Sequence, residues 1–114
     1  MATKPLVFVG SARAALQALP PDARQRLGAA LFAVQQGLEP TDWKPMPSVG
    51  PGVAELRVRT GRAFRAFYVA RFAEAVYVLH AFEKKAQRTP EPDLALGRAR
   101  YATLLANRLK ESDS

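Results

Sequence analysis

Basic side chains recur at short intervals through residues 55–90, between apolar runs of strand-like composition. They are Arg57, Arg59, Arg62, Arg65, Arg71, Lys84, Lys85 and Arg88. Short strands joined by tight turns would hold these charges over one surface, and a dense positive field attracts polyanions. Most cations of the chain are arginines, whose planar guanidinium forks onto phosphate oxygens. RNA is therefore the first ligand to consider.

The overall charge agrees with this interpretation. The chain has 114 residues, and 17 Lys and Arg against 10 Asp and Glu give a formal net charge of +7. A small basic protein that binds no nucleic acid is the alternative. The length suits a single domain, expected over residues 1–110, with a frayed tail at 111–114. The absence of cysteine excludes disulfides and thiolate metal sites.

Hydropathy predicts a cytoplasmic protein with no membrane partner. The apolar run near the N-terminus is too short for the core of a signal peptide. No run approaches the roughly 20 apolar residues that a membrane-spanning helix needs.

The first half of the chain predicts a strand and two helices. Residues 6–9 form a short β-branched run that indicates a strand. Ser11 is placed to cap a helix over 12–19. A second helix is expected from the prolines at 20–21 to Gly37. Residues 39–52 are rich in proline and predict an ordered loop, with Trp43 packed into the core or, alternatively, serving as a ligand platform.

The second half predicts three strands and a closing helix. Residues 53–59, 64–72 and 75–84 have strand character, and the short connections between them favour an antiparallel meander. A helix is expected from residues 90–93 to about 110. The order strand-helix-helix-strand-strand-strand-helix indicates an α+β domain, with helices against one face of a mostly antiparallel sheet.

Strand alternation sorts the side chains by face. Glu55, Arg57 and Arg59 share one face of their strand and are expected to be exposed. Arg65 and Arg71 mark the open face of the next strand, whereas the third strand is apolar on both faces. Pairing could bring Arg57, Arg65 and Lys84 onto one concave surface. The alternative is that these cations are solvated and pair with Glu55, Glu74 and Glu83.

The residue types favour electrostatic catalysis on RNA. The sequence shows no paired carboxylates in one motif and no cluster of metal ligands, so no metal or cofactor is expected. His80 is the only histidine, which excludes a two-histidine ribonuclease mechanism. RNA supplies its own nucleophile, the 2′-hydroxyl, and Arg and Lys can neutralise the charge that builds on phosphorus. A lysine of lowered pKa, His80 or a tyrosine could act as the base, although His80 could equally be a buried structural residue.

Several motifs follow one another in a familiar order. They are ELR at 55–57, FRAFY at 64–68, VLHAFEKKAQRTP at 78–90 and an arginine-rich final helix. This series resembles the HigB-like, phage-derived branch of the RelE/ParE superfamily of type II toxin–antitoxin toxins. Members typically carry Leu-His-Gly-Phe-x-Lys-Lys-x-x-Lys-Thr-Pro, and this chain differs by Ala81 and Arg88. The stretch Trp43-Lys44-Pro45-Met46 matches as well, so the resemblance spans residues 5–110.

The resemblance implies a RelE-like α+β fold and a metal-independent endoribonuclease, an mRNA interferase that inhibits translation by cutting message on the ribosome. It also implies a helix-turn-helix antitoxin of the HigA kind as partner. The catalytic candidates are Arg57, Arg65, Lys84 and His80. The RNA-binding candidates are Arg59, Arg62, Arg71, Lys85 and Arg88.

Two other functions remain open at this point. ParE-like members of the superfamily act on a protein target, DNA gyrase, without cutting RNA. A member of this branch could also be a non-toxic nucleic-acid-binding regulator.

Overall fold

A computed structural model describes residues 3–112, which fold into one mixed sheet flanked by helices. In chain order the elements are β1 (Leu6–Phe8), α1 (Ala12–Gln17), α2 (Pro21–Gln35), β2 (Trp43–Pro45), β3 (Val53–Arg59), β4 (Ala63–Val69), β5 (Val76–Lys84) and α3 (Glu91–Ser112). The strands lie in the order β1-β5-β4-β3-β2. Among these strands β1 and β5 pair in parallel, and the pairs β2–β3, β3–β4 and β4–β5 are antiparallel. The predicted α+β class with a mostly antiparallel sheet is confirmed.

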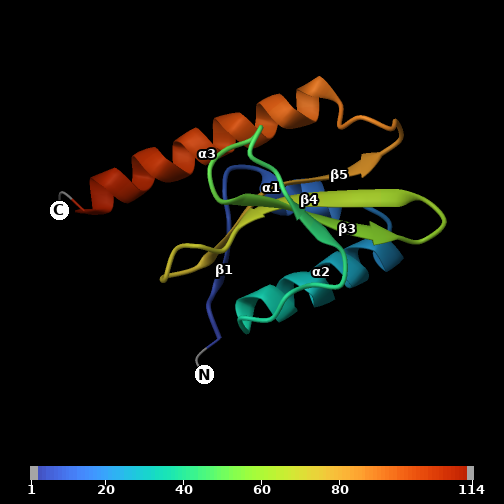
Figure 1. Ribbon diagram of the computed structural model, residues 1–114, viewed down its shortest axis with the longest axis horizontal. Coiled ribbons are helices and arrows are strands. Elements are labelled where there is room, and N and C mark those ends of the chain that lie inside the picture. Colours follow the sequence, from blue (N-terminus) through green and yellow to red (C-terminus); the bar gives the residue numbers. More distant parts are fainter. Residues whose placement is uncertain (1–2, 113–114) are drawn as a thin grey trace.

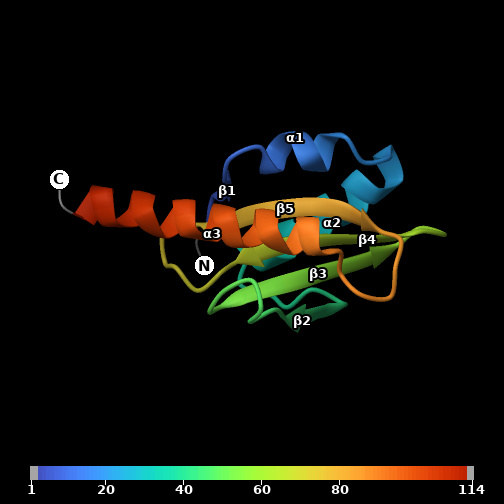
Figure 2. The same ribbon diagram turned by 90° about the horizontal axis from the view of Figure 1, so that it is seen from above.

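The helices cover both faces of the sheet, and the prediction of a single covered face is wrong. Figure 1 shows α3 above the sheet and α2 below it, and Figure 2, seen from above, shows α3 lying over the strands. Leu27 and Leu31 of α2 are buried in one core, and Tyr101 and Leu104 of α3 are buried in the other. The physical reason is that both side-chain sets of β4 and β5 are largely apolar, so neither face can be left in water.

A bulge in β5 strengthens the contact with α3. Phe67 pairs with His80, but the next residue, Tyr68, pairs with Val78, so Leu79 is an extra residue in β5. A bulge lets two consecutive side chains reach one face. Leu79 is fully buried in the core under α3, and His80 contacts Asp93 of that helix.

The segment predicted as a loop contains a short strand. Trp43–Pro45 pairs with β3 as the edge of the sheet, where a proline is tolerated because one side of the strand needs no ladder hydrogen bond. The prediction that Trp43 packs into the core is wrong, because the side chain is 37% exposed. Ser11 makes no capping hydrogen bond to α1. Its hydroxyl accepts a hydrogen bond from Arg100 of α3 instead.

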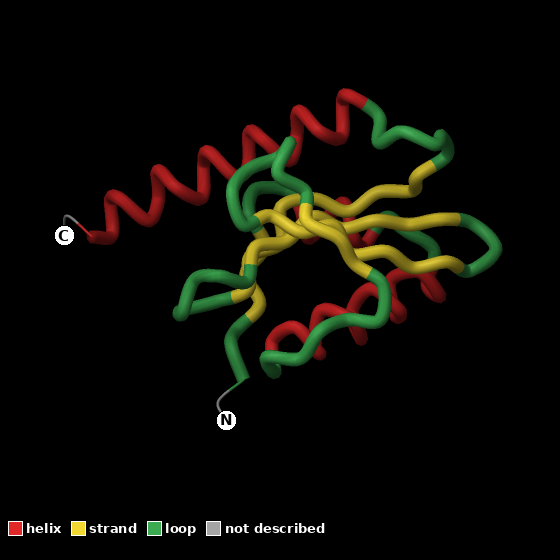
Figure 3. Tube along the Cα trace, in the orientation of Figure 1, coloured by secondary structure: helices red, strands yellow, loops and turns green. Residues whose placement is uncertain are grey.

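Helix α3 runs two residues further than the sequence predicts and ends at Ser112. The remainder of the tail predicted to fray, 113–114, lies outside the described residues. No helix within residues 3–112 is long and apolar enough to cross a lipid bilayer. Figure 3 shows the loop that follows β5 rising to the start of α3, at the same end of the sheet as the turn between β3 and β4.

Candidate nucleic-acid interface

Five cations gather at the end of the sheet that α3 leaves open. Arg57 lies directly opposite Arg65, and Lys84 lies opposite Ala63, which in turn pairs with Arg59. Lys85 follows in the loop after β5. We call Arg57, Arg59, Arg65, Lys84 and Lys85 the basic cradle. A shallow hollow of about 350 Å³ is lined by Arg59, Arg65, Lys84 and Lys85.

The position of α3 explains why this end of the sheet is charged. On the face of the sheet that α3 covers, the side chains of Val69, Phe67 and Leu79 are buried beneath the helix. Phe82 is the last apolar residue of β5 on this side, and the next residue on the same face is Lys84. The apolar pattern therefore stops where the helix cover stops, and cations take its place.

A buried carboxylate lies in the middle of the cradle, contrary to the prediction that Glu55 is exposed. The side chain of Glu55 is 0% exposed and that of Arg65 is 8% exposed. Glu55 Oε1 lies 3.4 Å from Arg65 Nε and 3.9 Å from Arg57 Nε. Lys44 Nζ lies 4.0 Å away on the edge strand. The alternative of solvated ion pairs is thus wrong for Arg65, which meets Glu55 away from water.

Burial, together with the neighbouring positive charge, perturbs the titration of Lys84. Burial lowers the pKa of Lys84, and the neighbouring cation Arg65 lowers it further, while Glu55 opposes the shift. Burial also lowers the pKa of Arg65, although a guanidinium remains charged at any physiological pH. The cradle therefore combines three guanidinium groups that stay charged with one lysine, Lys84, that gives up its proton more readily than usual.

His80 does not lie in the cradle. Its side chain is 7% exposed, its ring stacks on Phe82, and its Nε2 lies 2.7 Å from Asp93 Oδ1. The other ring nitrogen, Nδ1, lies 3.2 Å from Arg100 Nη1, which can only donate. Nδ1 must therefore accept, and the proton sits on Nε2. Four residues along a strand separate His80 from Lys84 by about 13 Å. The structure places His80 in the contact between β5 and α3.

Three of the RNA-binding candidates lie outside the cradle. Arg62 pairs with Glu83 and covers the ring of Phe64, whose side chain points to the face covered by α1 and α2. Arg71 donates to the Tyr101 hydroxyl at the opposite end of β4. Arg88 is exposed in the loop after β5, beyond the hollow. The structure therefore brings together Arg57, Arg59, Arg65, Lys84 and Lys85, and separates Arg62 and Arg71 from them.

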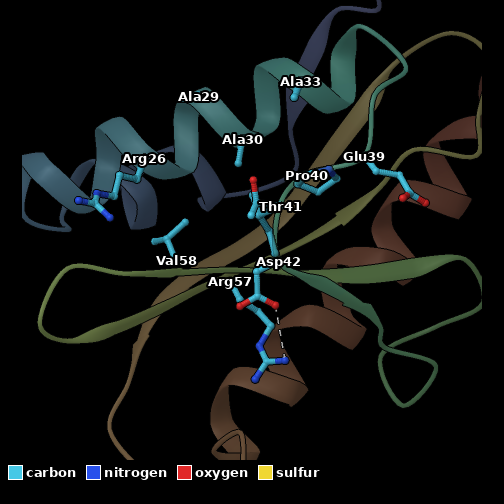
Figure 4. A pocket seen from close by; sticks show the side chains of 11 residues that line it. Arg26, Ala29, Ala30, Ala33, Glu39, Pro40, Thr41, Asp42, Arg57 and Val58 are labelled. Carbon is cyan, nitrogen blue, oxygen red and sulfur yellow. Dashed lines mark ion pairs between the residues drawn. The ribbon is translucent and has the colours of Figure 1, made fainter.

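A second hollow, of about 340 Å³, lies between α2 and the edge of β3. Figure 4 shows Ala30 and Val58 beside it and the side chain of Arg57 pointing away from α2, toward the ion pair with Asp42. The Arg57 Nη1 atom lies 3.8 Å from Asp42 Oδ1. The Arg57 guanidinium therefore lies between two carboxylates, with Asp42 near its Nη1 atom and the buried Glu55 near its Nε atom.

The sequence did not identify Lys44, Asp42, Thr89 or the buried state of Glu55 as parts of this site. Lys44 and Asp42 were not predicted as site residues because the segment that carries them was predicted as a loop. Thr89 donates from the loop after β5 to Glu55 Oε2 at 3.4 Å. One signal was available: Glu55 shares a face with Arg57 two residues later, directly opposite the strand that carries Arg65.

Within residues 3–112, no three His, Asp or Glu side chains form a group that could hold a metal ion. The ionisable groups of the described site include its cations and the carboxylate of Glu55. Such a site can bind an anionic group and stabilise negative charge that develops on it.

Comparison with known proteins places this site within a family. A family model described as phage derived protein Gp49-like (DUF891) matches residues 14–102, a segment that includes the whole basic cradle. A search of curated proteins found no significant match. The family match covers well over half of the chain. The chain therefore belongs to the Gp49-like family of phage-derived proteins, which is part of the RelE/HigB-type toxin group.

Proposed function

We propose that this protein is the toxin of a type II toxin–antitoxin system, of the HigB-like branch, and that it cleaves mRNA on the ribosome in the cytoplasm. One observation carries the proposal. Arg57 and Arg65 face each other across β3 and β4, and Lys84, whose pKa is lowered, lines an open hollow together with Arg65. Membership of the RelE/HigB-type toxin group supports the same function.

The arginines would act on the scissile phosphate. Arg57 and Arg65 would hold its non-bridging oxygens and stabilise the negative charge that grows on them in the transition state. The adjacent 2′-hydroxyl is the nucleophile, and the site needs only to align it with phosphorus. The new bond joins O2′ to phosphorus, the bond from phosphorus to O5′ breaks, and the leaving O5′ takes up a proton.

Lys84 would act as the general base. Only a neutral amine can take the proton of the 2′-hydroxyl, and the lowered pKa of Lys84 raises the neutral fraction near physiological pH. His80 has no part in this step, because its ring is buried against α3 and Phe82. Arg59 and Lys85 would hold the phosphates on either side of the scissile one, and Arg88 would contact more distant RNA.

The proposed partner is a helix-turn-helix antitoxin of the HigA kind. It would cover the basic cradle with acidic side chains, since complementary charge accelerates association. Added salt should therefore slow formation of the complex by screening this attraction. An association rate that does not change with salt would argue against an antitoxin that docks on the cradle.

Expression in a bacterium tests the proposal. Primer extension across cellular messages should show new 5′ ends within coding regions soon after induction, and growth should stop. The Arg57→Ala variant, expressed to the same level, should leave messages intact. Intact messages with growth arrest and a DNA-damage response would instead indicate a gyrase-directed toxin. Harmless expression with salt-dependent RNA binding would indicate a regulator.

A further inference from the structure

Glu55 is a buried ionisable group in the basic cradle that the proposed mechanism does not use. We infer that it is a positioning residue: its carboxylate aims Arg57 and Arg65 at the scissile phosphate and fastens the loop after β5 to the same point. This inference rests on the proposed function, because it assigns Glu55 a role in that reaction. It does not make Glu55 a catalytic residue, because a carboxylate with 0% exposure cannot touch the RNA.

The two oxygens of Glu55 serve different parts of the site. Oε1 faces the strands, at 3.4 Å from Arg65 Nε and 3.9 Å from Arg57 Nε. Oε2 faces the loop and accepts a hydrogen bond from the Thr89 hydroxyl at 3.4 Å. One carboxylate therefore links β3, β4 and the segment that carries Lys85. Its contacts therefore help to fix the two arginines and the loop after β5 relative to one another.

The carboxylate approaches both guanidinium groups from the Nε side. Arg65 Nη1 donates to the Phe64 carbonyl at 3.0 Å, and Arg57 Nη1 faces Asp42 at 3.8 Å. Within the described residues, neither Nη2 atom makes a hydrogen bond to another protein group. Each arginine is thus held at one edge and keeps a terminal donor for a phosphate oxygen, which is the arrangement that a guanidinium needs for anion recognition.

The contacts of Glu55 Oε1 with the two Nε atoms are longer than hydrogen bonds. Glu55 Oε1, Arg57 Nε and Arg65 Nε are buried and have no hydrogen-bond partner, and their separations exceed the usual N–H···O range of 2.7–3.2 Å. Unsatisfied buried polar groups are costly and rare. Catalytic hydrogen bonds are often long in free enzymes and shorten when the substrate binds. The free site is therefore ready to close around an anion that draws the two arginines together.

Replacing Glu55 with a neutral residue distinguishes two roles. Glu55 either positions Arg57 and Arg65 or only weakens the positive field that attracts RNA. Glu55→Gln removes one negative charge, so it should leave RNA binding unchanged or tighten it. If Glu55 only weakened the positive field, the variant would cleave at least as fast as the wild type. If Glu55 positions the arginines, turnover falls although binding does not. A misplacement of about 1 Å at a reacting centre can cost about 10²-fold in rate.

The experiment measures kcat and KM for cleavage of ribosome-bound message by three proteins. Glu55→Gln should lose about 10- to 100-fold in kcat with KM unchanged or lower. Glu83→Gln is the matched control, because Glu83 pairs with Arg62 on the other side of the sheet, and its kcat should stay within about twofold. A folded Glu55→Gln variant with wild-type kcat would overturn the inference. A wild type that leaves message intact would instead overturn the proposed function, and with it the role of Glu55.

Two further measurements decide the matter if Glu55→Gln does not fold. Thr89→Val keeps the shape of the side chain but removes the hydroxyl that contacts Oε2, and kcat should fall several-fold at unchanged melting temperature. In ¹⁵N spectra of the wild type, the Nε–H signals of Arg57 and Arg65 should shift together when a 2′-deoxy substrate analogue binds. Wild-type kcat in Thr89→Val together with unmoved Nε–H signals would overturn the inference.

Discussion

Arg57 and Arg65 lie directly opposite each other on β3 and β4, and their Nε atoms approach the same buried oxygen of Glu55, at 3.9 and 3.4 Å. Like charges at directly opposed positions destabilise an antiparallel sheet. A sheet selected only for stability would not place two arginines there. Local conflicts of this kind are expected at functional sites, where chemistry and stability compete.

Loss of Arg57 should abolish most of the activity without unfolding the protein. Its side chain is 34% exposed, so the fold should tolerate Arg57→Ala. Removing one donor to the transition state costs roughly 10²–10³ in rate. The measurement is kcat/KM for cleavage of ribosome-bound message. Arg24→Ala, which removes the same charge from an exposed position on α2, is the control. Equal losses in both variants would show that only net charge matters.

The pH dependence of cleavage should report Lys84. Because burial and Arg65 lower the pKa of this lysine, its neutral form increases as pH rises and reaches a plateau below the ordinary lysine value. Activity should follow that increase. Lys84→Arg keeps the charge but cannot be deprotonated, so the variant should lose both activity and this pH dependence. Profiles of kcat between about pH 6 and 9 test the assignment. Parallel profiles for the two proteins would exclude Lys84 as the base.

His80 should make the fold sensitive to acid. Burial lowers the pKa of His80 in the folded state, more than the hydrogen bond to Asp93 raises it. A protonated ring would also set Nδ1–H against the donor Arg100 Nη1. Because the unfolded state binds the proton more readily, stability is retained above about pH 6.5 and falls as pH drops through the folded-state pKa.

Urea unfolding at about pH 7.5 and pH 5.5 measures this effect. The wild type should lose stability between the two values. The His80→Gln variant should be less stable at the higher pH but lose less on acidification. A wild type whose stability does not change over this range would contradict the assigned neutral state of His80.

Two helical glycines should respond in opposite directions to alanine. A Cβ at Gly28 of α2 would meet nothing within 4 Å, so Gly28→Ala should stabilise by about 0.5–1 kcal/mol through helix propensity. A Cβ at Gly97 of α3 would lie 2.8 Å from the buried ring of Phe67. Overpacking of this kind costs about 1–3 kcal/mol. Thermal unfolding of both variants tests how closely α3 packs on the sheet. A stabilised Gly97→Ala variant would show that this contact is loose.

The strands that carry the cradle were predictable because their signals are local. Alternation and turn residues placed residues 53–59 correctly, and pairing of neighbouring strands then set Arg57 against Arg65. The edge strand was missed because Pro45 argues against regular pairing, and only the approach of β3 makes those three residues a strand. The position of α3 was missed because both faces of β5 are apolar, so the pattern gives no preference between them.

The burial of Glu55 could not be predicted from alternation. A charged face predicts exposure, but three cations from β2, β3 and β4 surround this carboxylate. That enclosure depends on contacts between segments far apart in the chain. His80 differs from Glu55, because it was predicted as a catalytic candidate and proves to lie in the contact between β5 and α3. Its contact with Asp93 depends on the bulge in β5 and on the packing of α3, which the sequence pattern does not reveal.

Cleavage by purified components tests the central claim most directly. The full-length protein is added to ribosomes programmed with a defined message, and primer extension maps the 5′ ends. New ends within the ribosome-bound segment are expected with the wild type, without added metal, and they should be absent with Arg57→Ala. Message that stays intact with folded wild-type protein would contradict the claim that this cradle of arginines and lysine cuts RNA.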